Sequence, residues 1–292
     1  MEKKRIRQII EARMSSDGLM ETGIPGVKLF RATEAVPCVP AVYEPSLIAI
    51  VSGGKETVLE GERFVYDNSQ YLCCPMSLPV RAGTPTASDD DPLFGVYIAL
   101  DPRIMSELTL EMERTSPPLP SSDVSPRGIK LARWDAGFAD ALLRLVQASE
   151  DPTDAAILGP LRLRELYYAV MKGEAGRFAR QAFGPGNPIA RSIAHVSQRL
   201  DENVSIDDMA ARAGMSRAAF HRNFKQATAM SPIQFVKSMR LNSAAMKIAG
   251  GMTVNEAAMD VGYVSPSQFS REFKRLYGHS PRQWSDLQQH PV

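Results

Sequence analysis

Histidine and cysteine are scarce in this 292-residue chain, and where they lie excludes whole classes of site. The four histidines are His195, His221, His279 and His290. The first 194 residues therefore contain no imidazole, so a metal centre built from several histidines and a carboxylate is not expected there. The three cysteines, Cys38, Cys73 and Cys74, are an odd number, which argues against the disulfide framework of a small secreted protein.

Long apolar runs are absent as well. No run approaches the roughly 20 residues that a membrane helix needs. The N-terminal segment MEKKRIRQIIEARM is charged and amphipathic, with Ile6, Ile9, Ile10 and Met14 at helical spacing, and it lacks the apolar core of a signal peptide. We therefore expect a cytoplasmic protein with no membrane partner.

The sequence also lacks the common catalytic motifs. It has no phosphate-binding P-loop, no dinucleotide fingerprint and no nucleophile elbow. We interpret its two acidic stretches, Asp89–Asp91 and Glu107–Glu113, as a solvated turn and a solvated helix face. We expect a protein that is not an enzyme and that uses neither a metal nor a cofactor.

A repeat dominates the last third of the chain. The segment Ser205–Phe235 returns as Thr253–Trp284, with matched positions 48 residues apart before a central turn and 49 apart after it. Val264 is the one inserted residue. In each copy an apolar helical stretch ends at a glycine, Gly214 or Gly262, and glycine readily takes the positive φ that ends many helices.

A second helix is predicted after each glycine. Ser216 and Ser265 are the expected N-caps, and Gln268 would complete a capping box with Ser265. Two phenylalanines spaced i, i+4 turn one face of each helix inward. The opposite face carries Arg217, His221, Arg222 and Lys225 in the first copy and Ser267, Ser270, Arg271 and Lys274 in the second. An apolar back with a donor-rich front is the layout of a helix-turn-helix recognition helix.

A longer helix is predicted between the copies. It opens at Ser231 and Pro232 and stops at Gly250 and Gly251. About 17 residues at roughly 1.5 Å each give a rod of about 26 Å. Such a rod could hold two recognition helices near the roughly 34 Å of one DNA turn, on one side of the duplex. A further helix is expected to start at Asn187 and Pro188.

The stretch from Asn187 to about Gln288 resembles the DNA-binding domain of the AraC/XylS family of bacterial transcription regulators. The resemblance is carried by AARAGMS, by SPIQF at the start of the linker helix, and by VNEAAMDVGYVSPSQFSREFKRLYGHSPRQW. It implies base contacts from Arg217, Ala218, His221, Arg222, Pro266, Ser267, Ser270 and Arg271. Phosphate contacts are expected from Ser216, Lys225, Ser265, Lys274 and Arg275. Ala218, Ala219 and Pro266 offer no side-chain hydrogen bonds, so methyl contacts and DNA shape would share the readout. The alternative for any single Arg or Lys is a solvated surface charge.

The balance of charged residues also changes at residue 187, where the resemblance begins. Residues 187–292 contain 13 Lys and Arg against 8 Asp and Glu, a net charge of +5. The remaining 186 residues contain 21 against 25, a net charge of −4. This split is typical of a DNA-binding module joined to a module that does not bind DNA.

The first part of the chain has a different pattern. From Val27 to Leu100, short β-branched and aromatic runs alternate with turn residues, which predicts an antiparallel sandwich or small barrel. Helical spacing follows from about Ile129 to Ser149 and from about Thr153 to Arg180. The proline-rich segment Ser116–Pro126 is the expected loop between these layouts, and Gly184, Pro185 and Gly186 mark the expected linker.

These patterns predict an α+β protein of two domains, a β-barrel or sandwich with flanking helices followed by an all-α double helix-turn-helix. The expected ranges are 1–183, with helices at about 129–180, and 187–292, with helix-turn-helix motifs at about 205–227 and 253–278 around a linker helix at about 232–249.

The N-terminal part, through YEPSLIAIVSGGKETVLEG, resembles the cupin-like N-terminal domain of one branch of the AraC family. The resemblance implies a barrel that binds an effector and helices that dimerise the protein. Two kinds of sensor stay open. Cys73 or Cys74 could react as a thiolate with Cys38 as its resolving partner, unless the cysteines are buried in a strand as small hydrophobes. A reversible pocket would instead be lined by the aromatic residues Tyr43, Phe64, Tyr66 or Tyr97.

We therefore expect a homodimeric, sequence-specific transcription regulator that binds double-stranded promoter DNA in two successive major-groove segments. A small-molecule or redox effector of unknown identity and RNA polymerase are its other expected partners. One alternative is a small-molecule-binding or catalytic cupin-like protein with secondary DNA binding, which the lack of histidine disfavours. The other is a ligand-free N-terminal dimerisation module.

Overall fold

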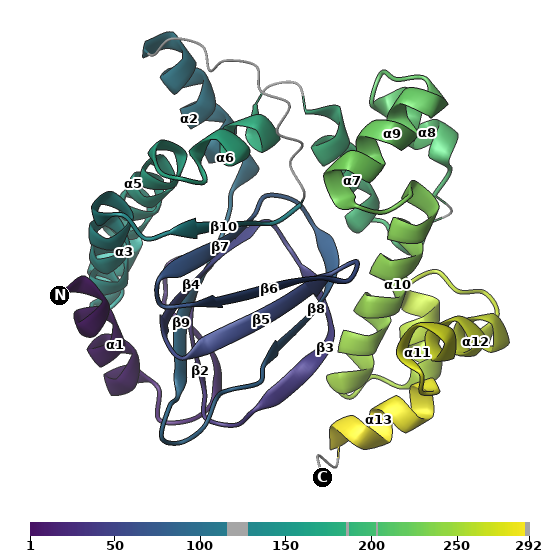
Figure 1. Cartoon of the computed structure of the whole chain (residues 1–292), viewed down its shortest axis with the longest axis horizontal. Coiled ribbons are helices and arrows are strands. Elements are labelled where there is room, and N and C mark those ends of the chain that lie inside the picture. Colours follow the sequence, from purple (N-terminus) through teal and green to yellow (C-terminus); the bar gives the residue numbers. More distant parts are fainter. Residues whose placement is uncertain (116–127, 185–186, 203, 290–292) are drawn as a thin grey trace. The chain divides into compact units, whose positions relative to one another are not determined.

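The computed structural model describes residues 1–115, 128–184, 187–202 and 204–289 (Figure 1). The chain divides into two compact units. One comprises Met1–Val39, Glu44–Met76 and Ala82–Asn187, and the other comprises Pro40–Tyr43, Ser77–Arg81 and Pro188–Val292. The expected loop Ser116–Pro126, and Pro185 and Gly186 of the expected linker, lie outside the described residues. The domain ranges 1–183 and 187–292 stay a proposal.

The strands of the chain form two sheets. They are β1 (Gly18–Glu21), β2 (Val27–Ala32), β3 (Val36–Tyr43), β4 (Ser46–Ser52), β5 (Gly54–Leu59), β6 (Glu62–Asp67), β7 (Gln70–Cys74), β8 (Leu78–Thr84), β9 (Leu93–Ala99) and β10 (Lys130–Arg133). One sheet has the order β1-β2-β9-β4-β7-β10 and the other the order β3-β8-β5-β6. The β4–β9 and β5–β6 pairs are antiparallel, as predicted. The prolines of β3 fit its edge position, because a sheet edge tolerates a missing backbone donor.

Both faces of the six-stranded sheet are buried, which explains why β4 is apolar without clear alternation. Leu47, Ala49 and Val51 belong to the core shared with the helices. Ile48 and Ile50, whose side chains point to the opposite face, are buried as well. A strand covered on both faces needs apolar residues at consecutive positions rather than at every second one.

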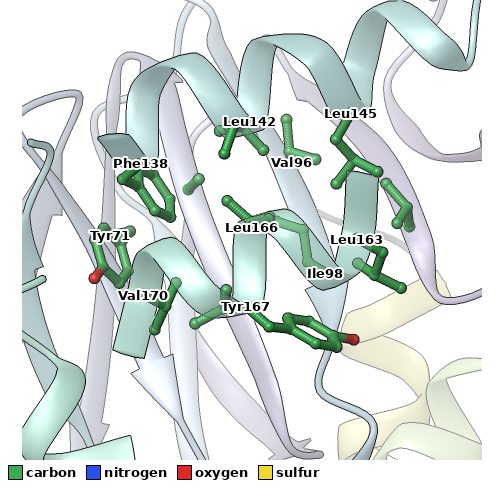
Figure 2. Close-up of a cluster of buried hydrophobic side chains, with 14 of the residues drawn as sticks. Tyr71, Val96, Ile98, Phe138, Leu142, Leu145, Leu163, Leu166, Tyr167 and Val170 are labelled. Atoms are coloured by element: carbon green, nitrogen blue, oxygen red, sulfur yellow. The ribbon is translucent and has the colours of Figure 1, made fainter. Parts of the chain in front are cut away.

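Helices cover one face of that sheet. They are α1 (Glu2–Arg13), α3 (Ala136–Ala148) and α5 (Gly159–Lys172). Figure 2 shows residues of α3 and α5, among them Phe138, Leu142 and Leu166, gathered around Tyr71 and Val96 of the sheet. The rings of Tyr71 and Phe138 stack with centroids 4.0 Å apart. This apolar layer holds the helices on the sheet, at roughly 1.5–3 kcal/mol for each large side chain that is fully buried.

The segment from Ile129 to Ser149, expected to be one helical stretch, begins instead with strand β10. Its residues Lys130–Arg133 pair with β7, and Ala132 is buried in the core. Helix α3 starts only after Asp135, whose side chain accepts a hydrogen bond from the Phe138 N–H as its N-cap. A four-residue strand is too short to show its period, so the helical prediction was wrong for these residues.

The second expected stretch, Thr153–Arg180, is broken into α4 (Pro152–Ile157), α5 and α6 (Gly176–Phe183). Pro160 lies in the first turn of α5, where its missing N–H costs nothing, so a new helix starts there. Helix α5 ends at Gly173, which has extended backbone angles. The acidic face of Glu107–Glu113 lies on helix α2 (Pro102–Thr115), in agreement with the interpretation of that stretch as a helix face.

The last part of the chain is helical. Its elements are α7 (Pro188–Ser197), α8 (Ile206–Arg212), α9 (Arg217–Thr228), α10 (Pro232–Ala249), α11 (Val254–Asp260), α12 (Pro266–Tyr277) and α13 (Pro281–Gln289). Figure 1 shows α10 running from the α8–α9 pair to the α11–α12 pair. The predicted α+β fold class, with a double helix-turn-helix around a linker helix, is thereby confirmed. The sequence did not predict α13, whose Trp284 packs against Phe273 and Tyr277.

Candidate nucleic-acid interface

Each recognition helix starts directly after a glycine turn. Gly214 and Gly262 have φ values of +65° and +84°, as predicted for residues that end a helix. The Ser216 hydroxyl then accepts a hydrogen bond from the Ala219 N–H, which caps α9. Ser265 caps α12 in the same way, with Pro266 at the first helical position. These local signals fix where the two donor-rich helices begin.

The expected capping box between Ser265 and Gln268 is only half formed. The Gln268 side chain donates to Glu272 Oε1 at 3.4 Å, one turn further along α12, instead of returning to the helix start. A charged carboxylate accepts more strongly than neutral groups do. A complete capping box occurs in α11 instead, between Thr253 and Glu256.

The backs of both recognition helices are anchored by phenylalanine. Phe220 and Phe224 of α9 are fully buried, with ring centroids 5.4 Å apart. Phe269 and Phe273 of α12 repeat the arrangement at the same distance. The matched spacing of these rings means that the two helices turn corresponding positions outward.

The outward faces carry the predicted contact residues. Seven of the eight expected base-contacting residues are exposed, and Ser270 is half-buried. Of the expected phosphate contacts, Ser216, Lys225, Lys274 and Arg275 are exposed, whereas Ser265 is half-buried in its capping role. The structure thus leaves accessible, on α9 and α12, the groups that could donate to bases and phosphates.

Arg217, the first residue of α9, has a partner that the sequence pattern did not identify. Its Nη1 lies 3.3 Å from both carboxylate oxygens of Asp207, in the first turn of α8. Both side chains are about two-thirds exposed, at 66% and 67%, so solvent screens the pair and its contribution to stability is small. Its effect is on where the guanidinium points.

The linker helix contacts both helix-turn-helix units. Arg240 of α10 donates from Nε to the Leu200 carbonyl at 2.8 Å and from Nη2 to the Glu202 carbonyl at 2.7 Å. One turn earlier, Lys237 Nζ lies 3.1 Å from Glu272 of α12. Tyr263, in the second turn, donates to the same carboxylate at 2.8 Å.

Glu272 is the half-buried charge at the centre of this network. Burial alone would raise the pKa of its carboxyl, but hydrogen bonds from Tyr263, Lys237 and Gln268 outweigh burial and lower it. The carboxylate therefore stays ionised at neutral pH. It ties α12 to α10 through a charge-assisted contact.

The adjacent cysteines Cys73 and Cys74 are closed off from solvent. Cys73 and Cys74 are fully buried, because adjacent strand residues point to opposite faces and both faces of the sheet are covered. Burial raises the pKa of Cys73 to about 12. Burial likewise raises the pKa of Cys74, whose sulfur lies 3.1 Å from the Met76 carbonyl. Their burial favours the interpretation of this pair as small core residues over the reactive-thiolate hypothesis, which stays a prediction. Cys38, on β3, is half-buried.

The four aromatic residues suggested for a reversible pocket lie on strands of both sheets. Tyr43 of β3 and Tyr66 of β6 are buried. Phe64 of β6 and Tyr97 of β9 are half-buried. Their role in ligand binding stays a prediction.

Across the described ranges, no group of three His, Cys, Asp or Glu side chains is placed to hold a metal ion. Among the helices of those same ranges, none combines the length and the apolar character needed to cross a membrane.

Two family models match this chain. Residues 23–178, more than half of it, match the model described as AraC-type transcriptional regulator N-terminus. The chain belongs to the AraC family of transcriptional regulators. Residues 209–286 match a helix-turn-helix domain model, a range that contains α9 to α12. The double helix-turn-helix described above is therefore the DNA-binding region of an AraC-family protein.

Curated relatives in the AraC family match about a third of this chain. MtrA of Neisseria gonorrhoeae is 35% identical over 99 residues, 32% of this chain and 33% of MtrA. SoxS of Escherichia coli (strain K12) is 31% identical over 90 residues, 30% of this chain and 84% of SoxS. The match thus spans about a third of the length of a relative such as MtrA.

A solved structure resembles the whole AraC-family fold seen here. The crystal structure of unsaturated fatty acid bound ToxT from Vibrio cholerae strain SCE256 has a TM-score of 0.56 at 10% identity, covering 93% of this chain and 97% of that one. At this identity the likeness concerns the fold alone.

Proposed function

We propose that this AraC-family protein is a sequence-specific regulator of transcription that reads two successive major-groove segments on one face of promoter DNA. The observation that carries the proposal is the pair of recognition helices, α9 and α12, each with a buried phenylalanine back and an exposed polar front. Their linker α10 has 18 residues, which makes it about 27 Å long. That length suits two helices entering neighbouring turns of one groove.

The exposed side chains divide by chemistry into two roles. Arg222 and Arg271 occupy matched positions on the outward faces, and a guanidinium pairs well with the O6 and N7 atoms of guanine. Lys225, Lys274 and Arg275 lie further along their helices and suit phosphates, which position the protein without reading sequence.

Selection of bound sequences from a random duplex library by the full-length protein, at stated salt, tests this function. We expect two enriched blocks about one helical turn apart. Arg222→Ala and Arg271→Ala should each weaken binding to the selected site by about 1–3 kcal/mol, and each should relax sequence preference in one block only. Lys274→Ala is the matched control, with a similar loss on all sequences and a shallower salt dependence. Equal affinity of the wild-type protein for selected and scrambled DNA would refute base readout.

The N-terminal unit is the proposed regulatory part of a protein that acts in the cytoplasm on promoter DNA and RNA polymerase and is not an enzyme. Its match to the family's N-terminal model supports this role. The ToxT structure with a bound unsaturated fatty acid supports a small-molecule effector as the signal. An unsaturated fatty acid is therefore the first compound to test for an effect on DNA affinity, and an unchanged affinity would argue against that ligand class.

Dimerisation is proposed through the outer side of α4 and α5. The inner side of α5 packs against the sheet, since Leu163, Leu166 and Val170 belong to the core. Ile157, the last residue of α4, and Leu161 of α5 are instead 65% and 64% exposed. Apolar side chains left in water on a helix that already packs on its other side suit a second copy of the chain. A dimer would bring two double helix-turn-helix units to a repeated site and raise affinity through effective concentration.

A further inference from the structure

The segment between α7 and α8 is held by the linker helix. Arg240 of α10 reaches across and donates two hydrogen bonds, to the carbonyl oxygens of Leu200 and Glu202. In the sequence this segment precedes α8, the first helix of the first helix-turn-helix. A planar guanidinium that binds two carbonyls with two different nitrogens restricts both the position and the orientation of its target.

The second helix-turn-helix touches the same segment from the other side. A Cβ built on Gly262 would lie 2.8 Å from the carbonyl oxygens of both Leu200 and Asp201. The turn of the second unit can therefore approach this closely only because residue 262 has no side chain. The matched glycine of the first unit, Gly214, has nothing within 4 Å of its Cβ position.

An ion pair also connects α10 to the second recognition helix, α12. Lys237, one turn before Arg240, pairs with Glu272 of α12 at 3.1 Å. Tyr263, the neighbour of Gly262, holds the same carboxylate. Contacts of Arg240, Gly262 and Glu272 thus join the second helix-turn-helix and the linker helix to the segment Leu200–Glu202, which precedes the first helix-turn-helix. We name these four elements the spacing clamp.

We propose that Arg240 is a positioning residue that fixes the distance and rotation between the two DNA segments read by α9 and α12. This inference rests on the proposed two-segment function. Inserting one base pair between the segments separates them by about 3.4 Å and rotates one against the other by about 34°. A rigid connection cannot absorb that change, whereas a connection made of the linker helix alone can bend at its ends.

A spacing series tests the clamp. The selected site is prepared with its two blocks at the preferred spacing and with one or two base pairs inserted or deleted, and each duplex is titrated with full-length protein. For the wild-type protein we expect affinity at the preferred spacing to exceed that at the altered spacings by at least about tenfold. For Arg240→Met we expect this ratio to fall to about threefold or less. Without the two hydrogen bonds from Arg240, the first helix-turn-helix can move relative to the linker helix. Arg240→Lys, which keeps the charge but not the two-nitrogen geometry, should give an intermediate ratio.

Lys247→Met is the matched control. Lys247 lies on the same helix and pairs with Asp260 of α11 at 2.6 Å, a contact within the second unit only. It should keep the wild-type ratio. Circular dichroism of each variant establishes that it is folded, and a purely structural role for Arg240 would lower affinity at all spacings equally.

The outcomes separate the two proposals. An Arg240→Met protein that is folded and keeps the wild-type ratio would overturn the clamp while leaving the two-segment function intact. A wild-type protein that has no spacing preference would overturn the two-segment function itself, and the clamp with it.

Discussion

At the scale of single residues, the ion pair between Asp207 and Arg217 places an acid beside a proposed base contact. A DNA phosphate competes with Asp207 for the same guanidinium, so the carboxylate weakens any contact that Arg217 makes with the backbone alone. A contact to a base edge in a matched site can still form when the rest of the helix is docked. We therefore expect Asp207 to favour specific over non-specific binding.

Asp207→Asn should therefore raise affinity for scrambled DNA and leave affinity for the selected site nearly unchanged. The slope of log K against log salt for scrambled DNA should steepen by up to about 0.9, the value for one additional phosphate contact. Asp208→Asn, at the exposed neighbouring residue, is the control and should not change the slope. An unchanged slope for Asp207→Asn would mean that the pair has no role in DNA discrimination.

Cysteine reactivity gives a second prediction at this scale. At pH 8 the native protein should react with a thiol reagent such as dithionitrobenzoate at Cys38, which is half-buried, and far more slowly at Cys73 and Cys74. The reason is that the raised pKa of Cys73, about 12, leaves few thiolates and burial blocks access to them. Denaturant should release both slow thiols. Fast labelling in a Cys38→Ser protein would show that the buried pair becomes accessible in solution.

At the scale of elements, the two turn glycines differ in their surroundings although they match in sequence. Gly214 and Gly262 both have positive φ, but only Gly262 has carbonyl oxygens where a side chain would start. The turn of the first unit is therefore constrained by conformation alone. The turn of the second is constrained by conformation and by packing.

Gly262→Ala should destabilise the DNA-binding unit more than Gly214→Ala. Each substitution carries the backbone cost of a left-handed residue, about 1–2 kcal/mol. Gly262→Ala adds an overpacking cost of about 1–3 kcal/mol. Thermal unfolding followed by Trp284 fluorescence gives the midpoints of the two variants. A Trp134→Phe background removes the only other tryptophan of the sequence. Equal midpoints for the two variants would contradict the close approach seen at Gly262.

The elements that the sequence predicted well are those whose boundaries are set locally. Helix α10 begins at Pro232 and α12 at Pro266, because serine caps, prolines and glycines act within a few residues of their own position. Strand β10 was missed because only its pairing with β7, almost 60 residues earlier in the chain, makes it a strand. In the candidate interface, too, local features could be predicted and long-range contacts could not. The outward faces of α9 and α12 follow from spacing, whereas Arg240 binds carbonyl groups that no side-chain pattern reveals.

At the scale of the whole molecule, the proposed dimer depends on the exposed apolar side of α4 and α5. Leu161→Glu should convert the proposed dimer to a monomer, because burying the introduced carboxylate in an apolar contact is costly. Molar mass by light scattering over a wide protein concentration range measures this. Val65→Glu, at another exposed apolar side chain on β6, is the control and should leave the mass unchanged. A monomeric wild-type protein, with or without DNA, would refute dimerisation.

The two recognition faces are not copies of one another, since Arg217, His221 and Arg222 stand where the second helix has Pro266, Ser270 and Arg271. A single chain of this kind fits a DNA site that has a direction, unlike the palindrome read by a twofold pair of identical helices. Inverting such a site in front of a reporter gene would preserve the affinity and reverse the order of the two units relative to the transcription start. We therefore expect transcription from a promoter controlled by this protein to depend on the orientation of its site.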